Sequence, residues 1–181
     1  MRISALVLCI ILSGCSASPE KLDSVGETEA ARMAPPVRRF SSYGNYELRP
    51  MILSPAVRIA PEKVAAAGTL ENTLRAKLQP LIERWNAASS NRASTLVIEP
   101  QLASLRIVSG GARFWAGAFA GDSSIDLDLA VTDQSTGEQV ARPRIILKAD
   151  AWAGGWSVGK SDKNLLDYIA SVAYAYMMMH Y

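Results

Sequence analysis

The first fifteen residues restrict how the rest of the chain can be stabilised. A short basic start precedes an uncharged run from Ile3 to Leu12, and the run closes on Leu12-Ser13-Gly14-Cys15. A basic n-region, an apolar h-region and small residues at a cleavage site are typical of a secretory signal peptide. The run is too short to span a membrane, which needs roughly 20 apolar residues. A cysteine directly after the small residues predicts a lipoprotein signal, cleaved before Cys15.

This cleavage would leave the mature chain without a disulfide. Cys9 lies inside the h-region and would be lost, and the sulfur of Cys15 would carry lipid. The domain must then be stabilised by a hydrophobic core, for which a hydrophobic content of 49% is ordinary. A plain secretory signal cut after Ala17 is the alternative interpretation.

Lipidation of Cys15 also predicts the location of the protein. By resemblance to the bacterial lipoprotein pathway, the sulfur receives a diacylglycerol, and the new amine receives a further acyl chain such as palmitate. Each buried methylene contributes about 0.8 kcal/mol, so three chains would hold the protein in the membrane almost permanently. Ser16, rather than Asp, follows the cysteine. By analogy with enteric bacteria, this favours the outer membrane, with the domain facing the periplasm.

The charge balance argues against nucleic acid as a partner. The chain has 19 basic and 17 acidic residues, and loss of Arg2 with the signal leaves 18 against 17. No basic run concentrates positive charge, as binding to phosphates would require. A length of 181 residues indicates one folded domain.

Composition divides the chain into three parts. Residues 1–14 are the predicted signal peptide. Residues 15–45 are small, polar and interrupted by Pro19, Pro35 and Pro36. We expect them to form a lipidated N-terminus and a flexible tether. Residues 46–181 are expected to form a single α+β periplasmic domain.

The clearest strand pattern covers residues 124–132. Hydrophobic residues alternate there with polar ones, which predicts a strand with Asp126 and Asp128 on the solvent side. A turn follows from Asp133 to Glu138, in which Gly137 can take a positive φ. A second strand from Gln139 to Ala151 would complete a hairpin. Further strands are expected at residues 51–59 and 96–108, with Pro100 imposing an edge position or a bulge.

Two helical patterns complete the fold. After a candidate N-cap at Thr69, leucines recur at helical spacing as far as Trp85, although Pro80 should kink or divide this helix. Ser161 or Asp162 can cap a C-terminal helix. Its expected apolar face is formed by Leu165, Ile169, Val172 and Tyr176, widened by Leu166, Ala170, Ala173 and Met177. The order of elements predicts an α+β fold: a largely antiparallel sheet with two helices packed on one face.

The segment from Gly154 to Ser161 matches the phosphate-loop pattern G-x-x-x-x-G-K-[ST]. Such loops belong to parallel sheets, with further strands and a magnesium-binding aspartate, whereas the strand before this segment belongs to a hairpin. We therefore interpret it as a glycine-rich strand-to-helix connection and expect no cofactor.

No catalytic constellation stands out. His180 is the only histidine and lies next to the last residue, so a histidine-dependent triad has little support. Asp122, Asp126, Asp128 and Asp133 do not have the spacing of an EF-hand loop, and we expect no metal. An alternative function keeps these carboxylates in a small periplasmic ligand-binding or hydrolytic site.

Two segments, Gly110–Gly121 and Trp152–Trp156, interleave aromatic residues with glycine. Glycine allows close backbone approach, and aromatic rings supply contact area. Either these rings close the core, or they form an interaction surface for a partner or the membrane interface. The candidate surface consists of Arg113, Phe114, Trp115, Phe119, Trp152 and Trp156.

From Arg113 to Val140 the chain resembles a family of uncharacterised bacterial envelope lipoproteins. The resemblance consists of G-x-x-x-G at Gly117 and Gly121, an alternating strand, and D-x-x-T-G from Asp133 to Gly137. It implies the location and the fold, and it transfers no catalytic residue, because the family has no assigned activity. The leading hypothesis is therefore a lipid-anchored, non-enzymatic module that binds or helps to assemble an envelope partner.

Overall fold

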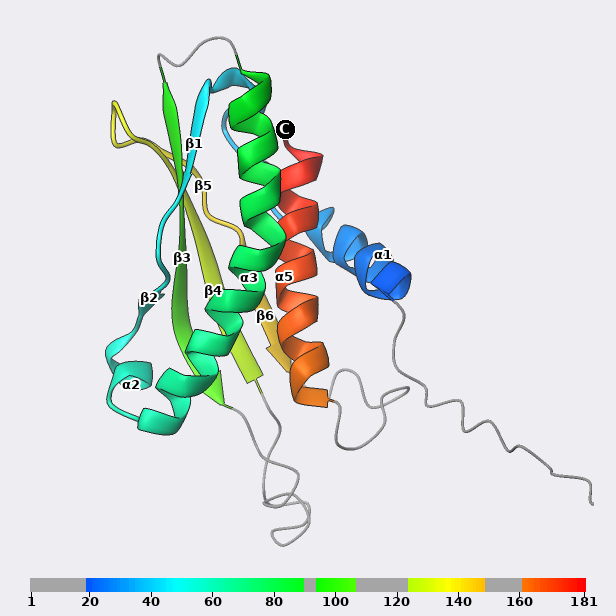
Figure 1. The fold of residues 1–181 in the computed structure, drawn as a ribbon, viewed down its shortest axis with the longest axis vertical. Coiled ribbons are helices and arrows are strands. Elements are labelled where there is room, and N and C mark those ends of the chain that lie inside the picture. Colours follow the sequence, from blue (N-terminus) through cyan, green and yellow to red (C-terminus); the bar gives the residue numbers. More distant parts are fainter. Residues whose placement is uncertain (1–18, 90–93, 107–123, 149–160) are drawn as a thin grey trace, which may run out of the picture.

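The computed structural model of the chain describes residues 19–89, 94–106, 124–148 and 161–181 (Figure 1). Two long helices cover one face of a sheet, and a shorter helix packs on the side of one of them (Figure 1). The helices are α1 (Pro19–Ala30), α2 (Pro55–Arg58), α3 (Pro61–Ala88), α5 (Ser161–Met179) and the 3-10 turn η1 (Phe40–Ser42). The strands are β1 (Asn45–Leu48), β2 (Ile52–Leu53), β3 (Thr95–Arg106), β4 (Ser124–Asp133), β5 (Gln139–Ala141) and β6 (Arg144–Lys148).

Strands β3 and β4 form the middle of the sheet. They pair antiparallel, from Leu96 opposite Asp133 to Arg106 opposite Ser124. β5 and β6 pair antiparallel with β4, and the short strands β1 and β2 pair parallel with β3. The predicted α+β fold is confirmed. The sheet is mixed, since its long ladders are antiparallel and only the two short strands beside β3 are parallel.

The predicted alternation is present in β4. Ile125, Leu127, Leu129 and Val131 are each at most 1% exposed and belong to the hydrophobic core. The turn is also confirmed, because Gly137 has a φ of 72° and β5 pairs with β4. The second strand is not continuous, however. It is divided into β5 and β6 around Pro143, whose nitrogen cannot donate to a ladder and whose carbonyl accepts from the backbone of Leu129.

Pro100 lies in a central strand rather than at an edge. The carbonyls of Ile98 and Leu102 accept from the backbone of Arg49 and Ser54, so this side of β3 faces β1 and β2. Alternation points the nitrogen of Pro100 to the same side, where it has no hydrogen to donate. The pairing with β1 ends at Leu48 and resumes with β2 at Ile52, which leaves Pro100 in the gap. The predicted edge position or bulge at Pro100 is therefore wrong, since Pro100 lies in regular register opposite Leu129; the register shifts only between Leu102 and Ser104.

Helix α3 differs from the prediction at its start. α3 begins at Pro61, with Ala60 as N-cap residue, and Thr69 lies inside it. A proline at N1 and Glu62 in the first turn favour this earlier start. The helix is not divided at Pro80. Of residues 51–59, only Ile52 and Leu53 form a strand, because α2 begins at Pro55.

The apolar face of α5 is confirmed. The residues predicted for it are all buried: Leu165, Leu166, Ile169, Ala170, Val172, Ala173, Tyr176 and Met177. Together with the buried stripe of α3 they pack on the inward side of β3 and β4. The predicted capping side chains of Ser161 and Asp162 lie outside the described side chains.

Residues 19–45 differ most from the prediction. In place of a flexible tether, the structure has α1, η1 and the start of β1, and both Ala30 and Phe40 are fully buried. Gly26 permits α1 to lie close to α5, because a Cβ there would be 3.0 Å from the backbone of Ser171. The backbone of Phe40 donates to the carbonyl of His180 at 2.9 Å. The tether prediction is therefore corrected from Pro19 onward.

Candidate functional site

Several predicted site residues lie outside the described part of the chain. These are Leu12, Ser13, Gly14, Cys15, Arg113, Phe114, Trp115, Phe119, Asp122, Trp152 and Trp156. The segment that resembles a phosphate loop also lies outside it, except for Ser161, where α5 begins. For all of these residues the sequence-based assignments stay predictions.

Two of the candidate carboxylates lie on the outer face of the sheet, away from the helices. Asp126 accepts two hydrogen bonds from Arg144, at 2.9 Å from Nε and 2.6 Å from Nη2. Asp128 accepts two from Arg142, at 3.0 Å from Nε and 2.9 Å from Nη2. The aspartate side chains are only 17% and 19% exposed. Each carboxylate is therefore held by the fork of one guanidinium.

This pairing determines the charge of the carboxylates. The hydrogen bonds from Arg144 are the main reason that the pKa of Asp126 lies below its usual value, although burial acts in the opposite direction. The same contact raises the pKa of Arg144. A general acid needs a carboxyl pKa raised toward the working pH. Asp126 is therefore suited to a permanent ion pair and not to proton transfer.

The arginines extend these pairs into a row across the sheet. Arg142 also donates to Gln101 at 2.8 Å, and Gln101 donates to Glu99 at 2.9 Å. Sequence reasoning missed the arginines, although a signal was present: Arg142 and Arg144 have the same spacing of two residues as the aspartates. The outer face is thus polar, but its charges largely compensate one another.

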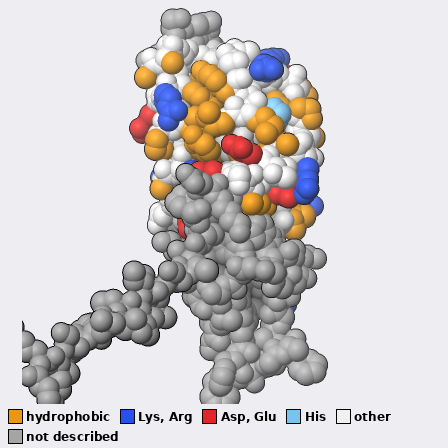
Figure 2. Space-filling view, turned by 90° about the vertical axis from the view of Figure 1, so that its right-hand side faces the viewer, with side chains coloured by type: hydrophobic (Ala, Val, Ile, Leu, Met, Phe, Trp, Pro, Cys, Tyr) orange, Lys and Arg blue, Asp and Glu red, His pale blue; other side chains and the backbone are white. Residues whose placement is uncertain are grey.

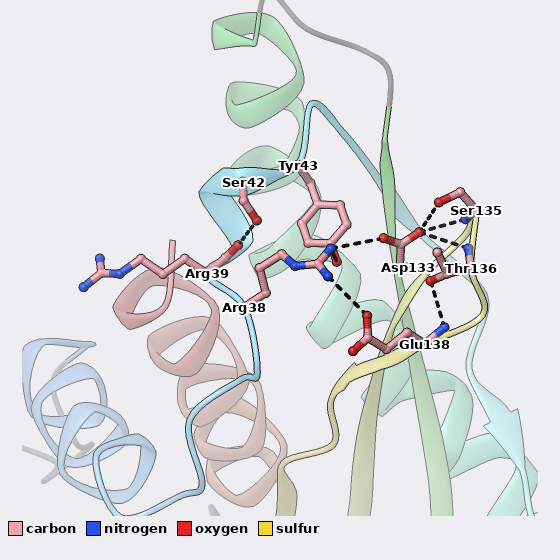
Figure 3. A network of polar contacts seen from close by, with 8 residues as sticks. All are labelled: Arg38, Arg39, Ser42, Tyr43, Asp133, Ser135, Thr136 and Glu138. Carbon is pink, nitrogen blue, oxygen red and sulfur yellow. Dashed lines mark hydrogen bonds and ion pairs between the residues drawn. The ribbon is translucent and has the colours of Figure 1, made fainter.

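Asp133 lies on the other face of β4. It continues the inward-facing series of Val131 and is only 3% exposed. Its Oδ1 accepts from the amide of Ser135 at 2.8 Å, the hydroxyl of Ser135 at 2.6 Å and the amide of Thr136 at 3.3 Å (Figure 3). The hydrogen bond from the Ser135 hydroxyl is the largest cause of the lowered pKa of Asp133. This carboxylate organises the turn.

Arg38 connects the N-terminal segment to the same turn (Figure 3). Its Nη1 lies 3.5 Å from Oδ2 of Asp133 and 3.2 Å from the hydroxyl of Tyr43. Its Nη2 lies 3.3 Å from Glu138. The guanidinium also lies 5.7 Å from the centre of the Tyr43 ring, within cation–π distance. The cluster fastens residues 38–43 over the end of the hairpin.

A second polar cluster joins α1, α3 and α5. The Lys77 ammonium donates to Asp23 at 2.6 Å and to the hydroxyl of Ser171 at 2.7 Å. Ser171 is 1% exposed, and its hydroxyl donates to Asp23 at 3.3 Å. Beside this cluster a groove of about 480 Å³ runs between α1 and α5, lined by Asp23, Glu27, Ser171, Tyr174, Ala175, Met178 and Met179.

Neither a metal centre nor a membrane span is found in the described ranges. Over residues 19–89, 94–106, 124–148 and 161–181, no three histidine, cysteine or acidic side chains are grouped so that they could hold a metal ion. Within the same ranges, every helix is too short or too polar to cross a bilayer.

Comparisons with known proteins do not show a family. No protein-family model matches the chain, and no curated protein matches it. Among solved structures, two PelC dodecamers from Paraburkholderia phytofirmans are similar. One is 16% identical over 81% of this chain and 95% of its own, and the other 14% identical over 80% and 94%, both with a TM-score of 0.44. A Xanthomonas campestris protein described as DUF330 is 12% identical over 81% of this chain and 84% of its own, with a TM-score of 0.35. Similarities at this level support no functional argument.

Proposed function

We propose that the chain is a lipid-anchored protein of the bacterial cell envelope, held in the outer membrane, whose periplasmic domain binds an envelope partner without catalysing a reaction. The anchor is supported by the motif Leu12-Ser13-Gly14-Cys15 after an apolar run. Of the carboxylates that a hydrolytic or ligand-binding site would use, the three in the described part of the chain already bind other groups of the protein. Arginines hold Asp126 and Asp128, and the turn holds Asp133. These contacts weigh against the alternative function, a ligand-binding or hydrolytic site built from these carboxylates.

The observation that carries the binding role is the place where the two aromatic-rich segments join the fold. Residues 107–123 connect β3 to β4, and residues 149–160 follow β6. Their junctions, Arg106, Ser124 and Lys148, are neighbours at one end of the sheet. The described residues that flank the segments containing Trp115 and Trp152 therefore lie at the same end of the sheet. Aromatic residues are favoured in the buried centre of protein interfaces.

The anchor is tested by replacing the predicted nucleophile. Cys15→Ser should abolish palmitate labelling and release the protein from the detergent phase, because a hydroxyl at this position cannot accept the thioether-linked lipid. Cys9→Ser is the matched control, since this cysteine lies in the h-region and should be lost with the signal. Normal labelling and normal membrane fractionation of Cys15→Ser would refute the lipoprotein interpretation.

The binding role is tested with photo-crosslinking amino acids placed in the living cell. A crosslinker at Trp115 or Trp152 should give adducts of the same size with one envelope protein. Gln134 is a suitable control, because it is exposed in the turn at the other end of β4. Adducts as strong from Gln134 as from the two tryptophans would contradict a partner surface at the junction end.

A further inference from the structure

The folded domain begins very close to the predicted lipid. Only Ser16, Ala17 and Ser18 separate Cys15 from Pro19, the first residue of α1. Four residue steps of chain span at most about 14 Å when fully extended. If Cys15 is held in a bilayer by its lipid, Pro19 must therefore stay within this distance of the bilayer surface.

α1 is fixed to the body of the domain and does not act as a loose leader. Gly26 brings it against the backbone of Ser171, where even a Cβ would approach to 3.0 Å. The Lys77 ammonium links Asp23 of α1 to Ser171 of α5 through hydrogen bonds of 2.6 and 2.7 Å. Ala30, at the end of α1, is fully buried. A constraint on the position of Pro19 is therefore a constraint on the whole domain.

The side of the molecule that carries α1 also exposes apolar side chains. Met178 and Met179, in the last turn of α5, are each 43% exposed and line the groove next to α1 together with Tyr174. Figure 2 looks onto this side and shows hydrophobic side chains gathered on its described part. The charge of Asp23 in the groove is paired with Lys77. Apolar and aromatic side chains beside a paired charge suit the boundary between headgroups and acyl chains.

We propose that the face formed by α1 and the end of α5 lies against the bilayer that holds the lipid of Cys15. We call it the α1–α5 face and define it by Asp23, Glu27, Tyr174, Met178 and Met179. Its occupant is the headgroup region of that membrane. The inference rests on the proposed lipid anchor, and it adds an orientation: the domain lies on the membrane through one defined side, with β2 and α2 turned away. In Figure 1, α1 and β2 lie on opposite sides of the molecule.

Fluorescence quenching by lipids tests this orientation. The lipidated mature protein has no free thiol, so Met179→Cys introduces one labelling site on the α1–α5 face. Ile52→Cys is the matched control on β2, because Ile52 is 45% exposed and Met179 is 43% exposed. Each variant is labelled with a fluorophore and reconstituted in phosphatidylcholine vesicles that carry a quencher on the headgroup. We expect several-fold stronger quenching at position 179 than at position 52.

The outcomes separate the inference from the anchor on which it rests. Protein that floats with the vesicles but is quenched equally at both positions, or more strongly at position 52, overturns the orientation alone. Protein that does not float overturns the lipid anchor, and the orientation with it. A third variant tests the role of α1: Gly26→Leu should remove most of the difference in quenching while the protein still floats. An unchanged difference would overturn the role of α1 in setting the orientation.

Discussion

Residues 19–45 contact the β4–β5 hairpin through Val37 and Arg38 and contact α5 through α1 and Phe40, yet only the hairpin and α5 were predicted from sequence. In β4 the burial pattern follows from the sequence of the strand itself, in which hydrophobic and polar residues alternate. The N-terminal segment has no such period. Phe40 is nevertheless fully buried, with ring centres 6.1 Å from Tyr176 and 6.3 Å from His180, at the far end of the sequence. The local sequence shows which side of a helix or strand is hydrophobic. It does not show which residues, distant in the sequence, bury a segment such as the one around Phe40.

The strongest test of this comparison is Phe40→Ala. If residues 31–43 were a tether, this change would leave stability unaltered. Because Phe40 is fully buried, we expect a loss of about 3–5 kcal/mol in the free energy of unfolding. Val37→Ala is the control from the same segment: Val37 is 71% exposed, and the change should stay within about 0.5 kcal/mol. Denaturant titration of the two variants and the wild type measures both effects. Equal stability of all three proteins would support the interpretation of this segment as a flexible tether.

The second test concerns the contact between α1 and α5. Gly26→Leu inserts a side chain where the backbone of Ser171 and Val172 already lies at 3.0–3.2 Å from the Cβ position. Backbone cannot give way as a flexible side chain can, so we expect a loss of about 1–3 kcal/mol.

Gly68→Ala is the matched control for this change. Gly68 lies inside α3, and a Cβ there would meet nothing within 4 Å. It should stabilise the protein by about 1 kcal/mol, the difference in helix propensity between the two residues. Thermal unfolding shows whether the two substitutions act in opposite directions. A neutral Gly26→Leu would mean that α1 does not pack on α5.

The elements predicted well from sequence are those whose signal is local. The leucine stripe of α3, the apolar face of α5 and the alternation of β4 follow from spacing alone. The sequence predicts the start of α3 too late, because Thr69 matches the N-cap pattern although it lies inside the helix. Thr69 instead donates its hydroxyl to the carbonyl of Ala65 inside the helix, at 3.3 Å. The parallel pairing of β1 and β2 with β3 was missed because a strand of two to four residues is defined by its neighbour.

The carboxylates show the same limit of prediction: local spacing indicates where a side chain lies, but a partner that is distant in sequence is not predicted. The solvent-side position of Asp126 and Asp128 on β4 follows from period two, and their arginine partners could have been found by matching the spacing of Arg142 and Arg144. Asp133 continues the inward-facing series of β4. The residues that cover Asp133 could not be predicted, because Arg38 and Tyr43 come from the distant N-terminal segment. Sequence spacing thus predicted the face of Asp126 and Asp128, whereas Asp133 was expected at the surface and is buried.

The hairpin turn provides the third test, with a somewhat smaller effect than at Phe40. Gly137 has a φ of 72°, and a Cβ there would meet nothing within 4 Å, so a substitution meets backbone strain alone. Gly137→Val should destabilise the domain by about 1–3 kcal/mol. Gly137→Asn is the control, since asparagine tolerates the left-handed region better and should lose less. Equal stability of Gly137→Val and the wild type would contradict the turn geometry.

Asp133→Ala tests the same turn through its carboxylate. A turn-capping carboxylate at the surface could be replaced by water. Asp133 is buried, however, and it accepts three hydrogen bonds from Ser135 and Thr136. Its loss would leave these donors without their acceptor and Arg38 with Glu138 as its remaining carboxylate partner, so Asp133→Ala should lower the melting temperature clearly. Asp133→Asn should lower it less, since the side-chain carbonyl can still accept. Identical melting of Asp133→Ala and wild type would show that the turn does not need the carboxylate.

The smallest expected effect is a dependence of stability on pH where the N-terminal segment contacts the end of α5. His180 packs against the rings of Phe40 and Tyr176, and its Nε2 is buried without a hydrogen-bond partner. Burial is the main cause that lowers the pKa of His180 below its usual value of 6.5, and the positive charge of Arg39 adds to it. Protonation of this ring is therefore harder in the folded protein than in the unfolded chain.

The sign of the effect follows from proton linkage. As pH falls below 6.5, the unfolded chain takes up a proton at His180 while the folded ring stays neutral, so the free energy of unfolding decreases with decreasing pH in this window. His180→Phe keeps an aromatic ring against Phe40 and Tyr176 and removes the titrating group. The stability difference between variant and wild type should be constant from neutral pH upward and should grow in favour of the variant between about pH 6.5 and about pH 5. Carboxylates titrate equally in both proteins and cancel in this difference. A difference that does not change between about pH 8 and about pH 5 would mean that His180 is not held neutral by its burial, and that the N-terminal segment covers the end of α5 less closely than the structure shows.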